Sequence, residues 1–215
     1  FFSMNPTTED NPVTTMRERA TPASQVDAGV DRRLTRRLAN DVAATFPDLI
    51  VAHQDGIFSG VLRMAPTRHD AQDITQETFI RAYRALLGYD SGRIRDLELR
   101  PWLWTIAVNL CRNAARSRSR SAVTVPLAGD DRAAVDTVDV AAEGIASLIA
   151  DEWQQRLDTL PEPQRNAIVL RHVVGLPYRE IATALDRPVG TTKADVHRGL
   201  EQLRGLLAAE IEETS

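Results

Sequence analysis

The stretch 177–207 constrains the fold more than any other, because it contains two short amphipathic segments separated by residues that interrupt a helix. In the first segment Ile181 and Leu185 share one helical face, and in the second segment apolar residues recur every three or four positions. The connection DRPVG supplies a proline that cannot continue a helix, an apolar Val189 to fill the angle, and a glycine for a backbone bend. Two such apolar stripes can pack on each other, so the stretch predicts a helix-turn-helix.

The second of these helices carries polar side chains near its N-terminus, namely Lys193, Asp195, His197 and Arg198. Side chains of these types, at that end of a recognition helix, reach bases and phosphates in a DNA major groove. The alternative is an ordinary helical hairpin with a solvated, charged face. We favour DNA binding.

The charge of the chain is segregated along its length. The formal net charge is −4 and the pI is about 5.6, which argues against a protein that coats nucleic acid by bulk charge. Residues 91–120 nevertheless contain seven arginines against two acids, and residues 121–152 contain seven acids against one arginine. A basic block beside an acidic block predicts local partners of opposite charge.

Composition narrows the class of protein further. The single cysteine, Cys111, excludes an internal disulfide framework and a multi-cysteine zinc site. No apolar run approaches the roughly 20 residues that span a bilayer, and no basic residue precedes an apolar stretch at the N-terminus. We therefore expect a cytoplasmic protein that does not insert into membranes. No nucleophile, base and orienting group fall together, so we expect no enzyme, no catalytic residue and no cofactor.

Apolar residues at helical spacing predict four helices in the N-terminal half, after an extension over residues 1–26 that lacks such a period and is expected to be disordered. The expected helices are 27–46, 47–65, 69–88 and 101–120. Pro47 is expected to begin the second, Gly88 to end the third, and Pro101 to lie in the first turn of the fourth.

The third of these helices has a strongly polar outer surface. Its members are Asp70, Asp73, Gln76, Glu77, Arg81 and Arg84. A metal site of His69, Asp73 and Glu77 is one interpretation, but ligands strung along a single helix diverge instead of converging on an ion. A charged surface that docks another protein is the interpretation we favour.

The loop 89–100 is polar and basic, and the helix after it mixes aromatic, amide and arginine side chains. In that helix Trp102, Ile106, Leu110 and Ala114 form the expected apolar stripe. Bases stack on aromatic rings and the nucleic-acid backbone attracts cations, so this combination fits single-stranded DNA. A core role for Trp102 and a merely solvated arginine run form the alternative.

Residues 121–144 are acidic and without helical period, which predicts a linker. Two further helices, 145–160 and 162–174, then precede the helix-turn-helix. The predicted fold class is all-α, with two small helical domains joined by the acidic linker. The domains are 27–120 and 145–215, and the second contains the helix-turn-helix.

Three segments together resemble an extracytoplasmic-function (group IV) bacterial RNA polymerase sigma factor. They are DAQDITQETFIRAYRAL, WLWTIAVNLCRNAAR and the run from RLDTLPEPQRNAIVL to the end of the helix-turn-helix. Each motif is weak alone, whereas the three in this order and spacing are specific. The resemblance implies a promoter-specificity subunit that binds core RNA polymerase and promoter DNA, and it implies an anti-sigma factor as a further partner. Its first domain would recognise and melt the minus-ten element, and its second would recognise the minus-thirty-five element.

The resemblance also implies roles for individual residues. Polymerase binding would fall to Asp73, Gln76, Glu77, Arg81 and Arg84. Minus-ten DNA would be bound by Tyr89, Arg93, Arg95, Arg100, Asn109, Arg112, Asn113 and Arg116. Minus-thirty-five DNA would be bound by Arg171, Tyr178, Arg179, Thr191, Thr192, Lys193, Asp195, His197 and Arg198.

Two positions depart from the family pattern: Asp195 stands where a basic residue is usual, and Thr192 where an apolar β-branched residue is usual. One interpretation is a capping box, in which the acid satisfies backbone donors at the start of the helix. The other is that Asp195 accepts a hydrogen bond from cytosine N4. A competing function for the whole chain is a transcription regulator that binds duplex DNA without joining polymerase.

Overall fold

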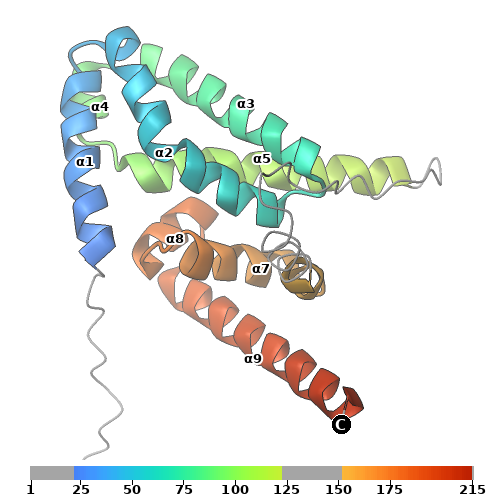
Figure 1. Cartoon of the computed structure of the whole chain (residues 1–215). Helices are drawn as coiled ribbons and strands as arrows, with labels where there is room; N and C mark the ends of the chain where they lie inside the picture. The colour runs from blue at the N-terminus through green and yellow to red at the C-terminus, as the bar shows by residue number, and fades with distance from the viewer. Residues whose placement is uncertain (1–21, 123–151, 215) are drawn as a thin grey trace, which may run out of the picture.

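The computed structural model describes residues 22–122 and 152–214, and every regular element in these ranges is a helix (Figure 1). The fold class predicted from the sequence is confirmed. Most of the expected linker and N-terminal extension lies outside the described residues, as does the first part of the helix expected at 145–160. Within the described ranges, none of the helices combines the length and apolar character that a membrane crossing requires.

The elements form two modules. The N-terminal module consists of α1 (Pro22–Leu38), α2 (Val42–Met64), α3 (Arg68–Leu87), α4 (Ser91–Arg95) and α5 (Leu99–Ala122). The C-terminal module consists of a helical segment at 152–158, α7 (Glu162–Ile168), the π-helical turn η1 (Val169–Val173), α8 (Tyr178–Leu185) and α9 (Val189–Thr214). In Figure 1 the second half of α9 extends away from the other helices.

Polar side chains set where several helices begin. The carboxylate of Asp41 accepts a hydrogen bond from the Ala44 backbone N–H at 3.0 Å, and the hydroxyl of Thr67 accepts one from Asp70 at the same distance. The cap at Asp41 starts α2 before Pro47, so the prediction that Pro47 begins this helix is wrong. The helix α3 ends before Gly88, as predicted.

The core of the N-terminal module is centred on α5. The expected stripe is partly wrong, because Trp102 and Ile106 are only half-buried. The most buried residues of α5 lie one or two positions later, and Trp104 is 2% exposed. The reason is that α5 contacts α2 and α3 on one side and α8 on another, so its buried surface is wider than one stripe.

The turn of the helix-turn-helix differs in detail from the prediction. Its left-handed residue is Asp186, with φ of 52°, and no glycine takes this role. Aspartate tolerates this region better than most residues because its short polar side chain can bond locally. Val189 does not fill the angle between the helices, because it is 40% exposed and begins α9.

The two modules pack directly on each other. The helix α8 lies along α5, and η1 contacts α2 (Figure 1). Gly60 of α2 lies at a close approach of the two modules, because a Cβ atom there would collide with the ring of Trp104 and lie 2.8 Å from Cγ2 of Val174. A single apolar cluster therefore includes residues from both modules.

Candidate protein and nucleic-acid interfaces

The polar surface predicted on the third helix lies along one exposed side of α3. Asp73, Gln76, Arg81 and Arg84 are exposed, and Glu77 is half-buried beside them. The Nε atom of Arg81 lies 2.7 Å from a carboxylate oxygen of Glu77, so these two residues form an ion pair within α3. Among the described residues no three histidine, cysteine or acidic side chains are grouped as they would be around a metal ion.

The predicted loop 89–100 contains the short helix α4. The carboxylate of Asp90 caps it by accepting a hydrogen bond from the Arg93 backbone N–H at 2.9 Å, and this bond lowers the pKa of the Asp90 carboxyl. The guanidinium carbon of Arg93 stands 3.7 Å from the ring centroid of Tyr89, whose ring is tilted against that of Trp102. Arginine and aromatic groups thus form one cluster next to the start of α5.

The predicted minus-ten residues of α5 divide into two sets. Asn109, Asn113 and Arg116 are exposed and share one side of the helix. Arg112 instead points to the C-terminal module, where its Nε atom donates to a Glu162 carboxylate oxygen at 3.1 Å. The structure therefore separates this arginine from the three residues that the sequence groups with it.

Arg100 is also turned toward the C-terminal module. Its Nε atom lies 3.6 Å from a carboxylate oxygen of Glu180 in α8, and its side chain is 12% exposed. Neither Glu162 nor Glu180 was predicted from the sequence. No periodicity could have found them, since each acid is 50 or more residues from its arginine in the chain.

The helix-turn-helix brings three of the predicted minus-thirty-five residues together, because two cationic side chains lie against the ring of Tyr178. The guanidinium carbon of Arg171 is 4.8 Å from the ring centroid of Tyr178, and Nζ of Lys193 is 5.4 Å from it. A guanidinium nitrogen of Arg171 also donates to the Leu176 carbonyl at 3.0 Å. Arg171 lies in the π-helical turn η1, and a Gly175 φ of 80° redirects the chain behind it.

The recognition helix α9 presents only part of its predicted set to solvent. Lys193, His197 and Arg198 are exposed and Thr191 is half-buried, whereas Thr192 is fully buried. The Thr192 hydroxyl donates to the Pro188 carbonyl at 3.1 Å. Thr192 therefore contributes to the interior of the motif and has no exposed surface for DNA.

The capping-box interpretation of Thr192 and Asp195 is wrong. The helix begins at Val189, so both residues lie inside it, and the threonine donates a hydrogen bond to a carbonyl instead of accepting one from a backbone N–H. Asp195 is 3% exposed and its carboxylate contacts two arginines, Arg187 and Arg198, each at 2.7 Å. Both of its oxygens are thus paired within the protein.

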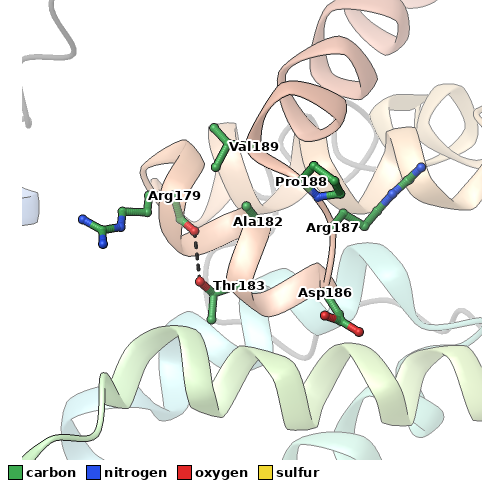
Figure 2. A pocket seen from close by; sticks show the side chains of 7 residues that line it. All are labelled: Arg179, Ala182, Thr183, Asp186, Arg187, Pro188 and Val189. Atoms are coloured by element: carbon green, nitrogen blue, oxygen red, sulfur yellow. Dashed lines mark hydrogen bonds between the residues drawn. The ribbon is translucent and has the colours of Figure 1, made fainter.

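An open hollow lies between α8 and the first turn of α9 (Figure 2). It is lined by Arg179, Ala182, Thr183, Asp186, Arg187, Pro188 and Val189. Figure 2 shows the side chains of Arg179 and Arg187 extending away from it in opposite directions. Arg187 is a basic residue of the turn that was not among the residues predicted to bind DNA.

Burial determines the state of the cysteine. Desolvation raises the pKa of the Cys111 thiol to about 12, so the group is protonated at neutral pH. Because the thiolate is the nucleophile and the metal ligand, this side chain serves as a core residue.

The fold consists of two helical modules, the second of which contains a helix-turn-helix. Both modules match families of known proteins. Residues 49–121 match Sigma-70 region 2, and residues 150–203 match Sigma-70 region 4. The RNA polymerase sigma-H factor of Pseudomonas aeruginosa is 32% identical over 182 residues, which cover 80% of this chain and 91% of sigma-H. The ECF RNA polymerase sigma-E factor of Escherichia coli is 34% identical over 190 residues and is covered to 92%. The chain therefore belongs to the extracytoplasmic-function (ECF) RNA polymerase sigma factors.

Other similar proteins agree with this family and fold. The ECF sigma factor SigE of Mycolicibacterium smegmatis is 34% identical over 173 residues, and the chain spans 65% of its length. A structure of CnrH in complex with the cytosolic domain of CnrY has a TM-score of 0.64 at 24% identity, covering 83% of this chain and 97% of CnrH. The sigma factor RpoE in complex with the anti-sigma factor NepR, from Bartonella quintana, has a TM-score of 0.59 at 20% identity and is covered to 96%.

Proposed function

We propose that this protein is a promoter-specificity factor that joins core RNA polymerase, recognises minus-thirty-five and minus-ten elements, and initiates transcription from them. The observation that carries the proposal is the presence of both sigma regions, in order, on one chain. We assign residues 27–120 to polymerase docking and minus-ten DNA, and residues 145–215 to minus-thirty-five DNA. The protein would have no catalytic residues of its own and would act in the cytoplasm, where the polymerase transcribes.

The exposed polar side of α3 supports the docking role. It mixes acids and bases that remain solvated in the free protein, which suits a reversible protein interface. The cluster of Tyr89 and Arg93 and the exposed amides of α5 support binding of the opened minus-ten strand, since flipped bases stack on rings and the backbone needs cations. A regulator that binds only duplex DNA would have no use for these surfaces, and we do not favour it.

An inhibitory protein partner is part of the proposal. RpoE has been solved with the anti-sigma factor NepR, and CnrH with the cytosolic domain of CnrY. We propose that this chain likewise binds an anti-sigma factor when it is not bound to polymerase. Affinity capture with the full chain as bait should then recover core polymerase and a second, smaller protein.

Reconstitution with core polymerase tests the central proposal. The protein should co-elute with core polymerase in size exclusion and direct run-off transcription from a cognate promoter. Binding to duplex DNA without co-elution would favour the regulator, and the absence of both activities would overturn the assignment.

Reversing the charge of Glu77 tests the docking surface. Glu77→Lys should weaken the affinity for core polymerase about tenfold, because it places a like charge against a complementary partner surface. Loss of the exposed pair with Arg81 costs only about 0.5 kcal/mol, so the fold should persist. Asp55→Lys, the same reversal at an exposed position of α2, is the control and should leave the affinity unchanged. Equal affinities of the two variants would remove α3 from the interface.

The ion pair between Arg112 and Glu162 should lower the affinity of the free protein for single-stranded minus-ten DNA. Glu162→Gln weakens the hold on Arg112, so the free protein should bind a minus-ten oligonucleotide about two- to fivefold more tightly in a fluorescence anisotropy titration. Glu152→Gln makes the same change in an acid that pairs with Arg156 of its own module, and it should have no effect. If the two variants bind alike, Glu162 does not restrain Arg112.

A further inference from the structure

Asp195 is an acid buried at the end of the protein that is expected to meet DNA. Its side chain is 4% exposed, and each of its two carboxylate oxygens contacts a different arginine. Oδ1 accepts a hydrogen bond from a terminal nitrogen of Arg198 at 2.7 Å, and Oδ2 lies 2.7 Å from a terminal nitrogen of Arg187. Burying a carboxylate is costly unless it is paired, and two guanidinium groups supply the pairing here.

The three side chains connect two parts of the motif, the turn and the recognition helix. Arg198 follows Asp195 by three residues on α9, so the two share a face of the helix. Arg187 comes from the turn before α9 and extends from it on the opposite side from Arg179 (Figure 2). The carboxylate therefore ties the turn to the recognition helix.

The basic side chains of this cluster are more exposed to solvent than the acidic one. The side chains of Arg198 and Arg187 are 56% and 30% exposed, whereas the acid between them is covered. Two positive charges against one negative charge leave the cluster net positive, and the positive groups are the ones that reach solvent. Held guanidinium groups also lose less side-chain freedom on binding phosphate or a base than free ones do.

We infer that Asp195 is a positioning residue, which holds the guanidinium groups of Arg187 and Arg198 for contact with minus-thirty-five DNA, and that Arg187 belongs to that DNA-binding surface. The inference rests on the proposed function. The family usually has a basic residue at position 195, and here Arg187 would supply a basic group close to that position. It replaces both earlier interpretations of Asp195, the helix cap and the reader of cytosine.

The sign of one measurement separates this role from simple repulsion. An acid that only repels phosphate weakens DNA binding, so its removal would tighten binding. An acid that positions two arginines strengthens binding, so its removal should weaken it. Asp195→Asn in reconstituted holoenzyme should lower the affinity for a minus-thirty-five duplex about fivefold in an anisotropy titration at fixed salt.

A matched variant controls for the change of charge. Glu201→Gln removes an exposed acid from the same helix, where it lies 3.3 Å from His197, and it should leave the affinity equal or slightly higher. Affinity for core polymerase and the thermal unfolding midpoint of each variant report whether the remainder of the chain is folded. If Asp195→Asn unfolds the C-terminal module, Arg187→Ala carries the test, because its side chain is partly exposed and Asp195 keeps its pair with Arg198 in that variant.

A double-mutant cycle shows whether Asp195 acts through the arginines. Arg198→Ala should lower the affinity for the duplex about tenfold and reduce the slope of its salt dependence by about one. Arg187→Ala should also lower the affinity. Adding Asp195→Asn to the Arg187→Ala, Arg198→Ala double variant should have no further effect, because nothing remains for the acid to position.

Three results would overturn the inference while leaving the proposed function intact. They are tighter duplex binding by Asp195→Asn, full additivity in the cycle, and wild-type affinity of Arg187→Ala. A changed base preference of Asp195→Asn across duplexes with single substitutions would restore direct readout in its place. Failure of the wild-type holoenzyme to bind any minus-thirty-five duplex would instead count against the proposed function.

Discussion

Replacing Trp104 with alanine will lower the free energy of unfolding by about 3–5 kcal/mol, the range for a large aromatic side chain removed from a packed core. The indole is 2% exposed and lies where α5 meets α2, in contact with the space that a side chain at Gly60 would occupy. Its removal leaves a cavity in the region where the two modules also touch. Chemical denaturation followed by circular dichroism measures the loss.

A second tryptophan provides the matched control for that experiment. Trp153 is 42% exposed, and its ring centroid lies 5.5 Å from the guanidinium carbon of Arg156. Trp153→Ala makes the same chemical change at the surface and should cost about 1 kcal/mol or less. If the two variants are equally stable, Trp104 is not the centre of the core.

Two glycines one helical turn apart on α2 should respond to alanine with opposite signs. Gly56→Ala will raise the free energy of unfolding by about 0.5–1 kcal/mol, because a Cβ there has open space and alanine restricts the unfolded chain. Gly60→Ala will lower it by about 1–3 kcal/mol, because its Cβ would collide with Trp104 and lie 2.8 Å from Val174. Thermal unfolding of the two variants under identical conditions measures both signs.

The Gly60 variant also tests the packing of the modules. Val174 is in the C-terminal module, so part of the penalty exists only while the two modules touch. Truncation of Val174 to alanine in the Gly60→Ala background should recover some stability, whereas the same truncation alone should lose some. Stabilisation by Gly60→Ala would contradict the close approach of α2, α5 and η1.

The contacts between modules bear on how the proposed function is regulated. Arg100 and Arg112 face acids of the C-terminal module, while the amides of Asn109 and Asn113 remain exposed. The partly exposed pair of Arg112 with Glu162 contributes only about 0–1 kcal/mol, so its replacement by a contact with DNA would cost little. None of the four residues in these two pairs belongs to the α3 surface that we propose docks polymerase.

Local sequence was sufficient for the helices and for the surfaces that depend on one helix. Apolar spacing identified the all-α class and the helix-turn-helix, and Gly88 ended its helix as predicted. The polar side of α3 could also be identified, because residues three and four apart share a face once the helix exists. Pro47 misled the prediction, since the cap at Asp41 starts the helix earlier than the proline rule suggests.

Tertiary structure decided everything that depends on residues far apart in the chain or separated by a turn. Periodicity describes one helix at a time, so it could not show that α5 is covered on several sides and that Trp104, more than Trp102, fills the core. It also could not pair Arg112 with Glu162 or Arg187 with Asp195. The sequence by itself determined the all-α class and the order of the long helices, but it missed the short helix α4 and placed the boundary between α1 and α2 too late. The packing of those helices decided which charges face solvent and which neutralise each other, because the burial and partners of a side chain exist only in the folded chain.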